Sequence, residues 1–137
     1  MKIGFIGVGI MGSPMAGHLI DGGHELFVND IGPIPKELAD KGATACGSAK
    51  EVTEKTDVII VMVPDTPDVE AVLFNAGGVA EGLSAGKIVV DMSSISPVDT
   101  KAFAAKINES NCQYLDAPVS GGEVGAKNGT LTIMIGG

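Results

Sequence analysis

Three glycines spaced as G-x-G-x-x-G follow a short apolar segment at the start of the chain, and they constrain the fold more than any other feature. Gly7 permits a tight turn after a strand, Gly9 lets a ligand approach the backbone, and Gly12 allows a helix to pack closely on that strand. The free N–H groups at the start of the helix can then bind the phosphates of a dinucleotide. Because 20 of the 137 residues are glycine, the spacing could also arise from ordinary turns, so its context decides between the two interpretations.

The residues after the glycine turn continue the pattern that a dinucleotide site requires. Apolar side chains recur at helical spacing over 11–20, and the glycines at 22–23 end that helix. A strand rich in β-branched and aromatic residues follows over 25–30 and ends in Asp30. In a dinucleotide site this carboxylate accepts hydrogen bonds from the adenosine ribose. The alternative is that Asp30 only forms the turn that continues over 31–33.

Strand and helix patterns alternate along the rest of the chain. The expected helices cover 35–41, 48–56, 66–74 and 96–110, and the expected strands cover 57–63, 87–91, 112–116 and 131–135. The run 57–63 is almost continuously apolar, which is typical of a strand buried on both faces. With 45% hydrophobic and 4% aromatic residues, the chain suits a single α/β domain over 1–137. We expect a doubly wound, Rossmann-type, mostly parallel sheet, whose ligands lie beyond the carboxyl ends of its strands.

The charge of the chain limits the classes of partner that it is expected to bind. Its net charge is −8, with nine lysines and no arginine, whereas nucleic acids and anionic membranes require a basic face. Neither is therefore expected as a partner. Because an arginine near the second strand usually holds the 2′-phosphate of NADP, and Asp30 is here followed by Ile31, NAD is favoured as the cofactor. Lys36 is close enough in sequence to leave NADP possible.

Membrane, disulfide and metal signals are missing from the sequence. No segment reaches the roughly eighteen continuous apolar residues of a membrane span, and the first strand is too short and glycine-broken for a signal peptide. We expect a soluble cytoplasmic protein without a membrane partner. Cys46 and Cys112 lie far apart, which predicts neither a disulfide framework nor a zinc site. His18 and His24 are not at metal-ligand spacing, so no metal site is expected, and a helix surface and a turn are their default positions.

Two further segments follow expected strands at their carboxyl ends, where ligands bind. The segment 63–66 would pass beneath the adenine or its ribose, and Asp68 is close enough to reach polar groups of the ligand. The alternative is a simple exit from the strand into a helix cap. Further along, the consecutive hydroxyls of Ser93 and Ser94 could meet the nicotinamide ribose or a substrate oxygen. Here the alternative is a loop that leads into the next helix.

The segment 116–122 differs from these two in kind. Ser120 supplies a hydroxyl donor, and Gly121 and Gly122 leave two N–H groups unobstructed by side chains. This combination can bind a small carboxylate without any arginine, which predicts a substrate site. The alternative is a flexible Gly-Gly turn without a ligand.

Two blocks of the sequence resemble the β-hydroxyacid dehydrogenase family, and the resemblance covers the whole chain. The first block is G-F-I-G-x-G-x-M-G-x-P-M-A over 4–16, and the second is D-A-P-V-S-G-G over 116–122. The resemblance implies an NAD(P)-dependent oxidoreductase that interconverts a small β-hydroxy acid and its semialdehyde. In such an enzyme Ser120, Gly121 and Gly122 would hold the substrate carboxylate. The cofactor residues would be Gly7, Val8, Gly9, Ile10, Met11, Gly12, Asn29, Asp30, Val63, Pro64, Asp68 and Ser94.

Two short segments distinguish branches within this family. The sequences D-M-S-S-I over 91–95 and S-G-G-E over 120–123 look closer to the tartronate semialdehyde reductases. The 3-hydroxyisobutyrate dehydrogenases tend to carry a threonine at the position of Ser94 and to lack the acid after the glycines. We therefore expect the reductase branch, with the dehydrogenase branch as the alternative.

The sequence departs from the family at its end. Family members continue into a long helix with a catalytic lysine and then into a helical domain that closes the cleft and forms the dimer, and none of this follows Gly137. We therefore expect no catalytic residue in this chain, which would be inactive alone as the cofactor-binding part of a two-domain, homo-oligomeric enzyme. Lys127 does not match the family position and is assigned to the surface. A non-catalytic NAD-binding module and an interaction scaffold remain the alternatives from other functional classes.

Overall fold

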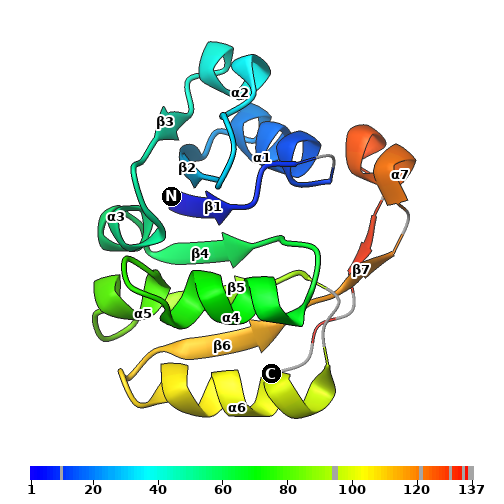
Figure 1. Ribbon diagram of the computed structural model, residues 1–137. Coiled ribbons are helices and arrows are strands. Elements are labelled where there is room, and N and C mark those ends of the chain that lie inside the picture. Colours follow the sequence, from blue (N-terminus) through cyan, green and yellow to red (C-terminus); the bar gives the residue numbers. More distant parts are fainter. Residues whose placement is uncertain (10, 94–95, 121, 130, 134, 136–137) are drawn as a thin grey trace.

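The computed structural model describes residues 1–9, 11–93, 96–120, 122–129, 131–133 and 135 (Figure 1). The strands of its main sheet are β1 (Lys2–Ile6), β2 (Glu25–Asn29), β3 (Thr44–Ala45), β4 (Val58–Val61), β5 (Ile88–Asp91) and β6 (Gln113–Asp116). The helices are α1 (Gly12–Asp21), α2 (Lys36–Asp40), α3 (Ala49–Lys55), α4 (Thr66–Phe74), α5 (Val79–Gly82), α6 (Pro97–Asn108) and α7 (Gly122–Asn128). Two short strands, β7 (Val119–Ser120) and β8 (Thr132–Ile133), lie outside the main sheet.

Six strands form one fully parallel sheet in the order β3-β2-β1-β4-β5-β6. The central strand β1 pairs with β2 on one side and with β4 on the other, so the chain reverses its direction of winding between β1 and β4. This is the strand order of the doubly wound dinucleotide-binding fold, and it confirms the predicted fold class. Such sheets bind ligands at the carboxyl ends of the strands, next to the reversal.

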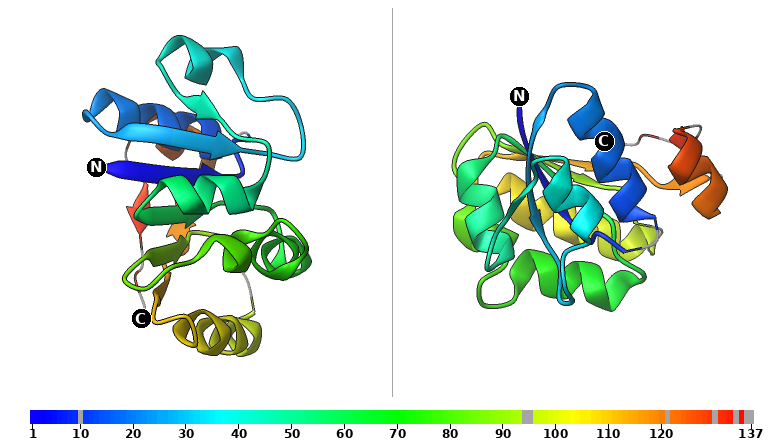
Figure 2. Two further views of the ribbon diagram at one scale, coloured as in Figure 1. Left: turned by 90° about the vertical axis from the view of Figure 1, so that its left-hand side faces the viewer. Right: turned by 90° about the horizontal axis from the view of Figure 1, so that it is seen from above.

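Helices cover both faces of the sheet, as the left view of Figure 2 shows. Along β4, Ile59 and Val61 pack into the core beneath α3 to α6, whereas Ile60 packs into the core on the opposite face. Phe5 of β1 belongs to that second core, which α1 covers. A strand between two layers of helices needs apolar side chains on both of its faces, which explains the nearly unbroken apolar run over 57–63.

The helices α3 and α6 both begin directly after a serine, but only one of the two serines caps its helix. The hydroxyl of Ser48 accepts a hydrogen bond from the Glu51 backbone N–H at 3.1 Å, and the Glu51 carboxylate accepts one from the Gly47 N–H at 2.7 Å. Ser48 thereby caps α3, and the Glu51 carboxylate satisfies the N–H of Gly47, one residue before the position that a capping box uses. At α6, Pro97 occupies the first turn, and the side chain of Ser96 makes no capping hydrogen bond.

The structure differs from the prediction after β6. Within the predicted strand 131–135 the described residues form β8, which pairs antiparallel with β7 in a separate two-stranded sheet. The segment 116–122, predicted as a substrate site with a Gly-Gly turn as the alternative, leads into α7, which begins at Gly122. This helix packs on α1, and Ala126 is fully buried in the core on that side of the sheet. The contact joins residues 108 positions apart, so no local pattern could predict it.

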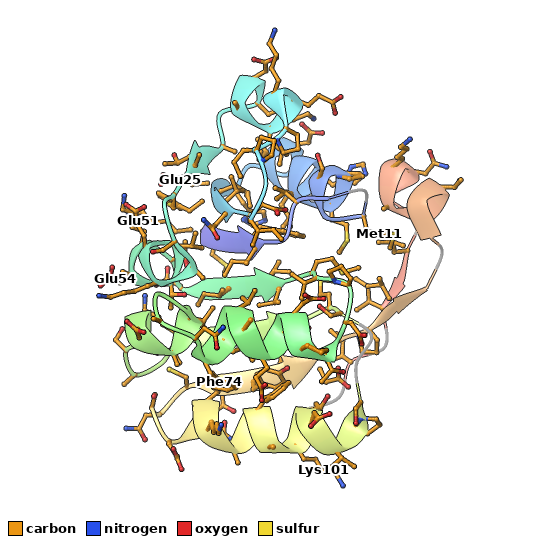
Figure 3. The ribbon with its side chains drawn as sticks, viewed as in Figure 1. Met11, Glu25, Glu51, Glu54, Phe74 and Lys101 are labelled. Atoms are coloured by element: carbon orange, nitrogen blue, oxygen red, sulfur yellow. The ribbon has the colours of Figure 1, made fainter. Side chains whose placement is uncertain are left out.

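Lys87 closes the C-terminal end of α3. Its Nζ donates to the carbonyl oxygens of Thr53 at 2.5 Å and of Thr56 at 2.6 Å. A cation at this end of a helix satisfies free carbonyls and interacts favourably with the helix dipole. We expect Lys87→Met to lower the free energy of unfolding by about 2 kcal/mol in urea denaturation. The control is Lys101→Met, because Lys101 is exposed on α6 (Figure 3), and equal effects of the two changes would contradict the capping role.

Candidate functional site

A pocket of about 590 Å³ opens at the carboxyl ends of β1 and β4, where the sheet reverses its winding. We call it the switch-point pocket. Its wall consists of the glycine turn after β1, the end of β2 and the segment that leads from β4 into α4. The lining residues are Ile6, Gly7, Gly9, Met11, Gly12, Asn29, Asp30, Ile31, Met62, Val63, Pro64, Asp68, Ala71 and Val72.

The pocket brings together most of the residues that the sequence predicts for the cofactor. Among the others, Val8 is buried beside the turn, and Ile10 and Ser94 lie outside the described residues. The apolar part of the wall was not predicted as part of the site, and it is formed by Ile6, Ile31, Met62, Ala71 and Val72. Ala71 and Val72 lie in α4, one helical turn after Asp68. Because residues three and four apart share a helix face, the helical spacing from Asp68 could have identified them.

The three glycines of the turn have different surroundings. Gly7 has a backbone φ of 96°, and a β-carbon there would collide with the carbonyl group of Met62. At Gly12 a β-carbon would collide with the carbonyl oxygen of Gly7. At Gly9 it would meet no atom within 4 Å. The fold itself therefore requires Gly7 and Gly12, whereas Gly9 is required only if a ligand approaches the backbone at this point.

Asp30 holds the glycine turn against the end of β2. One carboxylate oxygen accepts a hydrogen bond from the Val8 backbone N–H at 2.8 Å, and the other accepts one from the Gly32 N–H at 3.1 Å. The second bond is the turn contact that the alternative interpretation of Asp30 predicts. Each oxygen can still accept a further hydrogen bond, so a ribose hydroxyl could bind without displacing either partner. The structure thus gives Asp30 a positioning role that its sequence context does not reveal.

The wall on the α4 side combines apolar and acidic side chains. Pro64, Ala71 and Val72 line it, and Asp68 is exposed on the first turn of α4. Ile31 lines the pocket after β2 and is fully exposed. A large apolar side chain without cover at the rim of an apolar pocket is typical of a surface that binds a ligand.

Two other polar side chains near the pocket, those of Asp65 and Asn29, form hydrogen bonds within the protein. The carboxylate of Asp65 accepts a hydrogen bond from the Thr66 N–H at 2.7 Å, so the strand-exit-into-cap alternative for this segment is present as well. The amide of Asn29 donates to the carbonyl oxygen of Cys46 at 2.9 Å and so links the end of β2 to the segment after β3.

The loop after β5 corrects one expectation. Ser93, considered with Ser94 as a hydroxyl facing a ribose or a substrate, is fully buried, and its Oγ accepts a hydrogen bond from the Val63 N–H at 2.9 Å. The interpretation of Ser93 as a ligand contact is wrong, because its hydroxyl points into the protein. Behind it, burial raises the pKa of the Asp91 carboxyl, although hydrogen bonds from Tyr114 and Ser93 oppose the shift.

The predicted substrate segment lies between β7 and α7. Ser120 ends β7, Gly122 begins α7, and Gly121 lies outside the described residues. Figure 1 places both elements on the side toward which the strands of the main sheet point. The imidazole Nε2 of His18 on α1 lies 2.9 Å from the carbonyl oxygens of both Ala126 and Lys127. His18 therefore links α1 to α7, the helix that follows the predicted substrate segment. From the sequence, only a position on a helix surface is expected for His18.

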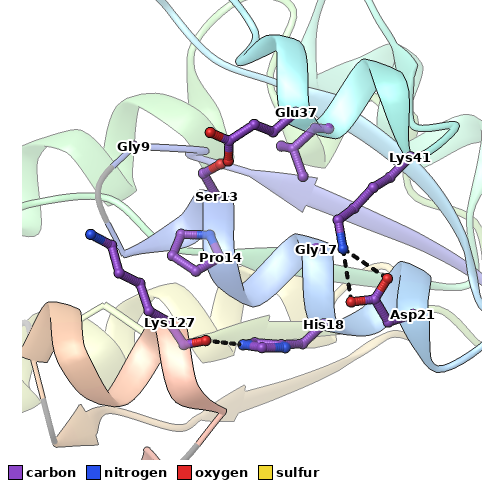
Figure 4. A pocket seen from close by; sticks show the side chains of 10 residues that line it. Gly9, Ser13, Pro14, Gly17, His18, Asp21, Glu37, Lys41 and Lys127 are labelled. Atoms are coloured by element: carbon purple, nitrogen blue, oxygen red, sulfur yellow. Dashed lines mark hydrogen bonds and ion pairs between the residues drawn. The ribbon is translucent and has the colours of Figure 1, made fainter.

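A second pocket, of about 440 Å³, lies between α1, α2 and α7 (Figure 4). Within it, the Nζ of Lys41 lies 2.8 Å from both carboxylate oxygens of Asp21. Lys127 also lines this pocket, and its exposure agrees with the predicted surface position. Gly9 belongs to both pockets, so the glycine turn separates them.

The described part of the chain offers little other chemistry. No group of three or more His, Cys, Asp or Glu side chains within it could hold a metal ion. Cys46 and Cys112 are both free and buried, and burial raises the pKa of the Cys46 thiol. No described helix has the length and apolar character needed to cross a membrane.

Comparisons with known proteins agree with the geometry of the site. A family profile described as the NAD binding domain of 6-phosphogluconate dehydrogenase matches residues 2–137. The 2-hydroxy-3-oxopropionate reductase of Escherichia coli is 57% identical over 137 residues, which cover 100% of this chain and 47% of that enzyme.

Solved structures also match nearly the whole chain. A 3-hydroxyisobutyrate dehydrogenase of Mycobacterium tuberculosis with L-serine matches with a TM-score of 0.90 and 34% identity over 99% of this chain and 46% of that one. Psf3 in complex with NADP+ and 2-OPP matches with a TM-score of 0.87 and 27% identity over 97% and 48% of the two chains. The chain thus spans about half the length of the curated relatives it matches.

Proposed function

The chain belongs to the family of NAD-binding domains described for 6-phosphogluconate dehydrogenase, and from this premise we propose that it binds the cofactor for a 2-hydroxy-3-oxopropionate (tartronate semialdehyde) reductase. The observation that carries the proposal is the 57% identity to the E. coli reductase, because it extends over the whole chain. A 3-hydroxyisobutyrate dehydrogenase is the second candidate, favoured by the structural match at a TM-score of 0.90. Both candidates act on small hydroxy acids or their aldehydes.

The described residues fit a dinucleotide. The open space above Gly9 would admit a pyrophosphate against the backbone, and the start of α1 would offer it N–H donors. Asp30 would accept hydrogen bonds from the adenosine ribose, and its charge would disfavour the 2′-phosphate of NADP. The apolar surface formed by Ile31 and the α4 side of the pocket suits a flat adenine ring. We therefore favour NAD, with NADP as the alternative.

The cofactor, once bound, supplies the hydride, and these 137 residues bind and orient. We assign the glycine turn, Asp30 and the segment 63–64 to holding the cofactor, and Ser120, Gly121 and Gly122 to holding the substrate carboxylate. Reduction of an aldehyde also needs a proton donor for the developing alkoxide. We assign none of these 137 residues to that step, because the resemblance implies that the donor is a lysine on the long helix that follows the family's cofactor-binding domain.

Binding and turnover test different parts of this proposal. Titration with NADH and NADPH, followed by nucleotide fluorescence, should show saturable binding with NADH preferred. No binding at millimolar concentrations of either would leave only an interaction scaffold. The full-length enzyme should then reduce tartronate semialdehyde faster than it oxidises 3-hydroxyisobutyrate. Binding without turnover of either substrate would instead support a non-catalytic NAD-binding module.

We extend the proposal to a full-length enzyme that works in the cytoplasm as a homo-oligomer. The support for both points is the family resemblance, since the resemblance implies a second domain that forms the dimer. Light scattering on the full-length enzyme would test the assembly, and a monomer at micromolar concentration would contradict it.

A further inference from the structure

A chain of hydrogen bonds runs behind the switch-point pocket and links three neighbouring strands. It starts at the backbone N–H of Val63, which donates to the hydroxyl of Ser93 at 2.9 Å. Ser93 in turn donates its own backbone N–H to one carboxylate oxygen of Asp91 at 3.0 Å. The other carboxylate oxygen accepts a hydrogen bond from the hydroxyl of Tyr114 at 2.6 Å. The hydrogen-bond chain thus passes from β6 through the end of β5 to Val63, the second residue after β4.

Val63 is the residue at which the backbone leaves the sheet and enters the pocket wall. The preceding residue, Met62, still donates its N–H to Ile6 of β1 at 2.9 Å, as a sheet residue does. Val63 instead finds its acceptor in the side chain of Ser93, 30 positions away. The hydroxyl of Ser93 therefore determines where the strand exit Val63–Pro64 runs, and both of these residues line the pocket.

Because the side chains of this hydrogen-bond chain are buried, the loss of any one partner leaves a polar group without a bond. Ser93 and Asp91 are fully buried and Tyr114 is 5% exposed, so solvent cannot replace a lost partner without a local rearrangement. One oxygen of Asp91 accepts from the Ser93 backbone N–H and the other accepts from the Tyr114 hydroxyl, so the carboxylate is held from both sides. Asp91 and Tyr114 thereby hold the backbone of Ser93 in the position from which its hydroxyl accepts the Val63 N–H.

We infer that Ser93 is a positioning residue of the cofactor site, which shapes the pocket wall by holding the Val63 N–H, and that Asp91 and Tyr114 orient it from behind. This inference rests on the proposed cofactor function of the pocket. None of the three side chains touches the cofactor in this assignment. Their effect on its affinity passes through the position of Val63 and Pro64.

Removal of single hydroxyls from the full-length protein tests the inference. In Ser93→Ala and Tyr114→Phe, the dissociation constant for NADH, measured well below the unfolding temperature, should rise about tenfold and about threefold. Asp91→Asn keeps a side chain that can bond to both neighbours, so it should bind NADH more tightly than Asp91→Ala. The matched control is Thr56→Val, which removes a buried hydroxyl bonded to the Val52 carbonyl at the amino end of β4, away from the pocket. It should lower the melting temperature without changing the NADH affinity.

The outcomes separate this inference from the proposed function. If the unmodified protein fails to bind NADH, both are overturned. If it binds NADH, but Ser93→Ala and Tyr114→Phe bind it within twofold of the unmodified protein, only the positioning role is overturned. A loss of NADH affinity in Thr56→Val as large as that in Ser93→Ala would also overturn it, since any buried hydroxyl would then have the same effect. If Ser93→Ala does not fold, Tyr114→Phe and the Asp91 pair decide the question alone.

Discussion

Gly9→Ala is expected to abolish NAD binding while the fold stays intact. A β-carbon at this position meets no atom within 4 Å, and therefore costs the protein no contact. The same space is where a pyrophosphate would approach the backbone, so a methyl group there would push the phosphates away from the N–H groups at the start of α1. We expect the dissociation constant for NADH to rise by at least about 100-fold, equivalent to the loss of roughly 3 kcal/mol of binding free energy. Fluorescence titration would measure it, and thermal unfolding would check the fold.

Gly12→Ala is the matched control for this change. It adds the same methyl group three residues away, but there the β-carbon would collide with the carbonyl oxygen of Gly7. It should therefore lower the melting temperature of the protein as well as weaken binding, because the turn and α1 must separate. If Gly9→Ala binds NADH within a few-fold of the unmodified protein, the pyrophosphate does not pass over Gly9, and the dinucleotide occupies another part of the pocket.

The contrast between these glycines shows what a sequence pattern can predict. The spacing over 7–12 and the alternation of apolar runs are local, and local preferences are enough to predict the parallel sheet and the pocket at its switch point. The apolar run over 57–63 likewise predicts a strand buried on both faces. Each of these features depends on residues within a few positions of one another, and the structure confirms the fold that they predict.

Features that depend on distant contacts could not be predicted in this way. The hydroxyl of Ser93 turns inward because the Val63 N–H, 30 positions earlier, needs an acceptor. The segment after β6 forms α7 and a separate two-stranded sheet because it packs on α1, where His18 bonds to the carbonyl of Ala126. A hydroxyl or a glycine pair looks the same in sequence whether it faces a ligand or a structural partner, and only the fold distinguishes the two.

Asp30 has both a structural partner and a proposed ligand, and its replacement should separate the structural role from the ligand-binding role. The carboxylate holds the Val8 N–H at 2.8 Å and, in our proposal, also binds the adenosine ribose. Asp30→Ala removes both interactions, so we expect NADH to bind about 30-fold more weakly, as for the loss of one or two charge-assisted hydrogen bonds. NADPH should lose less affinity, because the change also removes a negative charge that would face its 2′-phosphate. Titration of each variant with both nucleotides measures the two effects side by side.

Asp30→Asn distinguishes the charge from the hydrogen bond. The amide keeps one oxygen that can accept from Val8, so the glycine turn should stay in place, whereas the charge that disfavours NADPH is gone. We therefore expect the preference for NADH over NADPH to fall by about tenfold, with a smaller loss of NADH affinity than in Asp30→Ala. If Asp30→Ala instead weakens NADH and NADPH equally, and Asp30→Asn leaves their ratio unchanged, Asp30 acts only by holding the glycine turn. The choice between the two nucleotides would then have to come from other residues around the end of β2, of which Ile31 lines the pocket beside it.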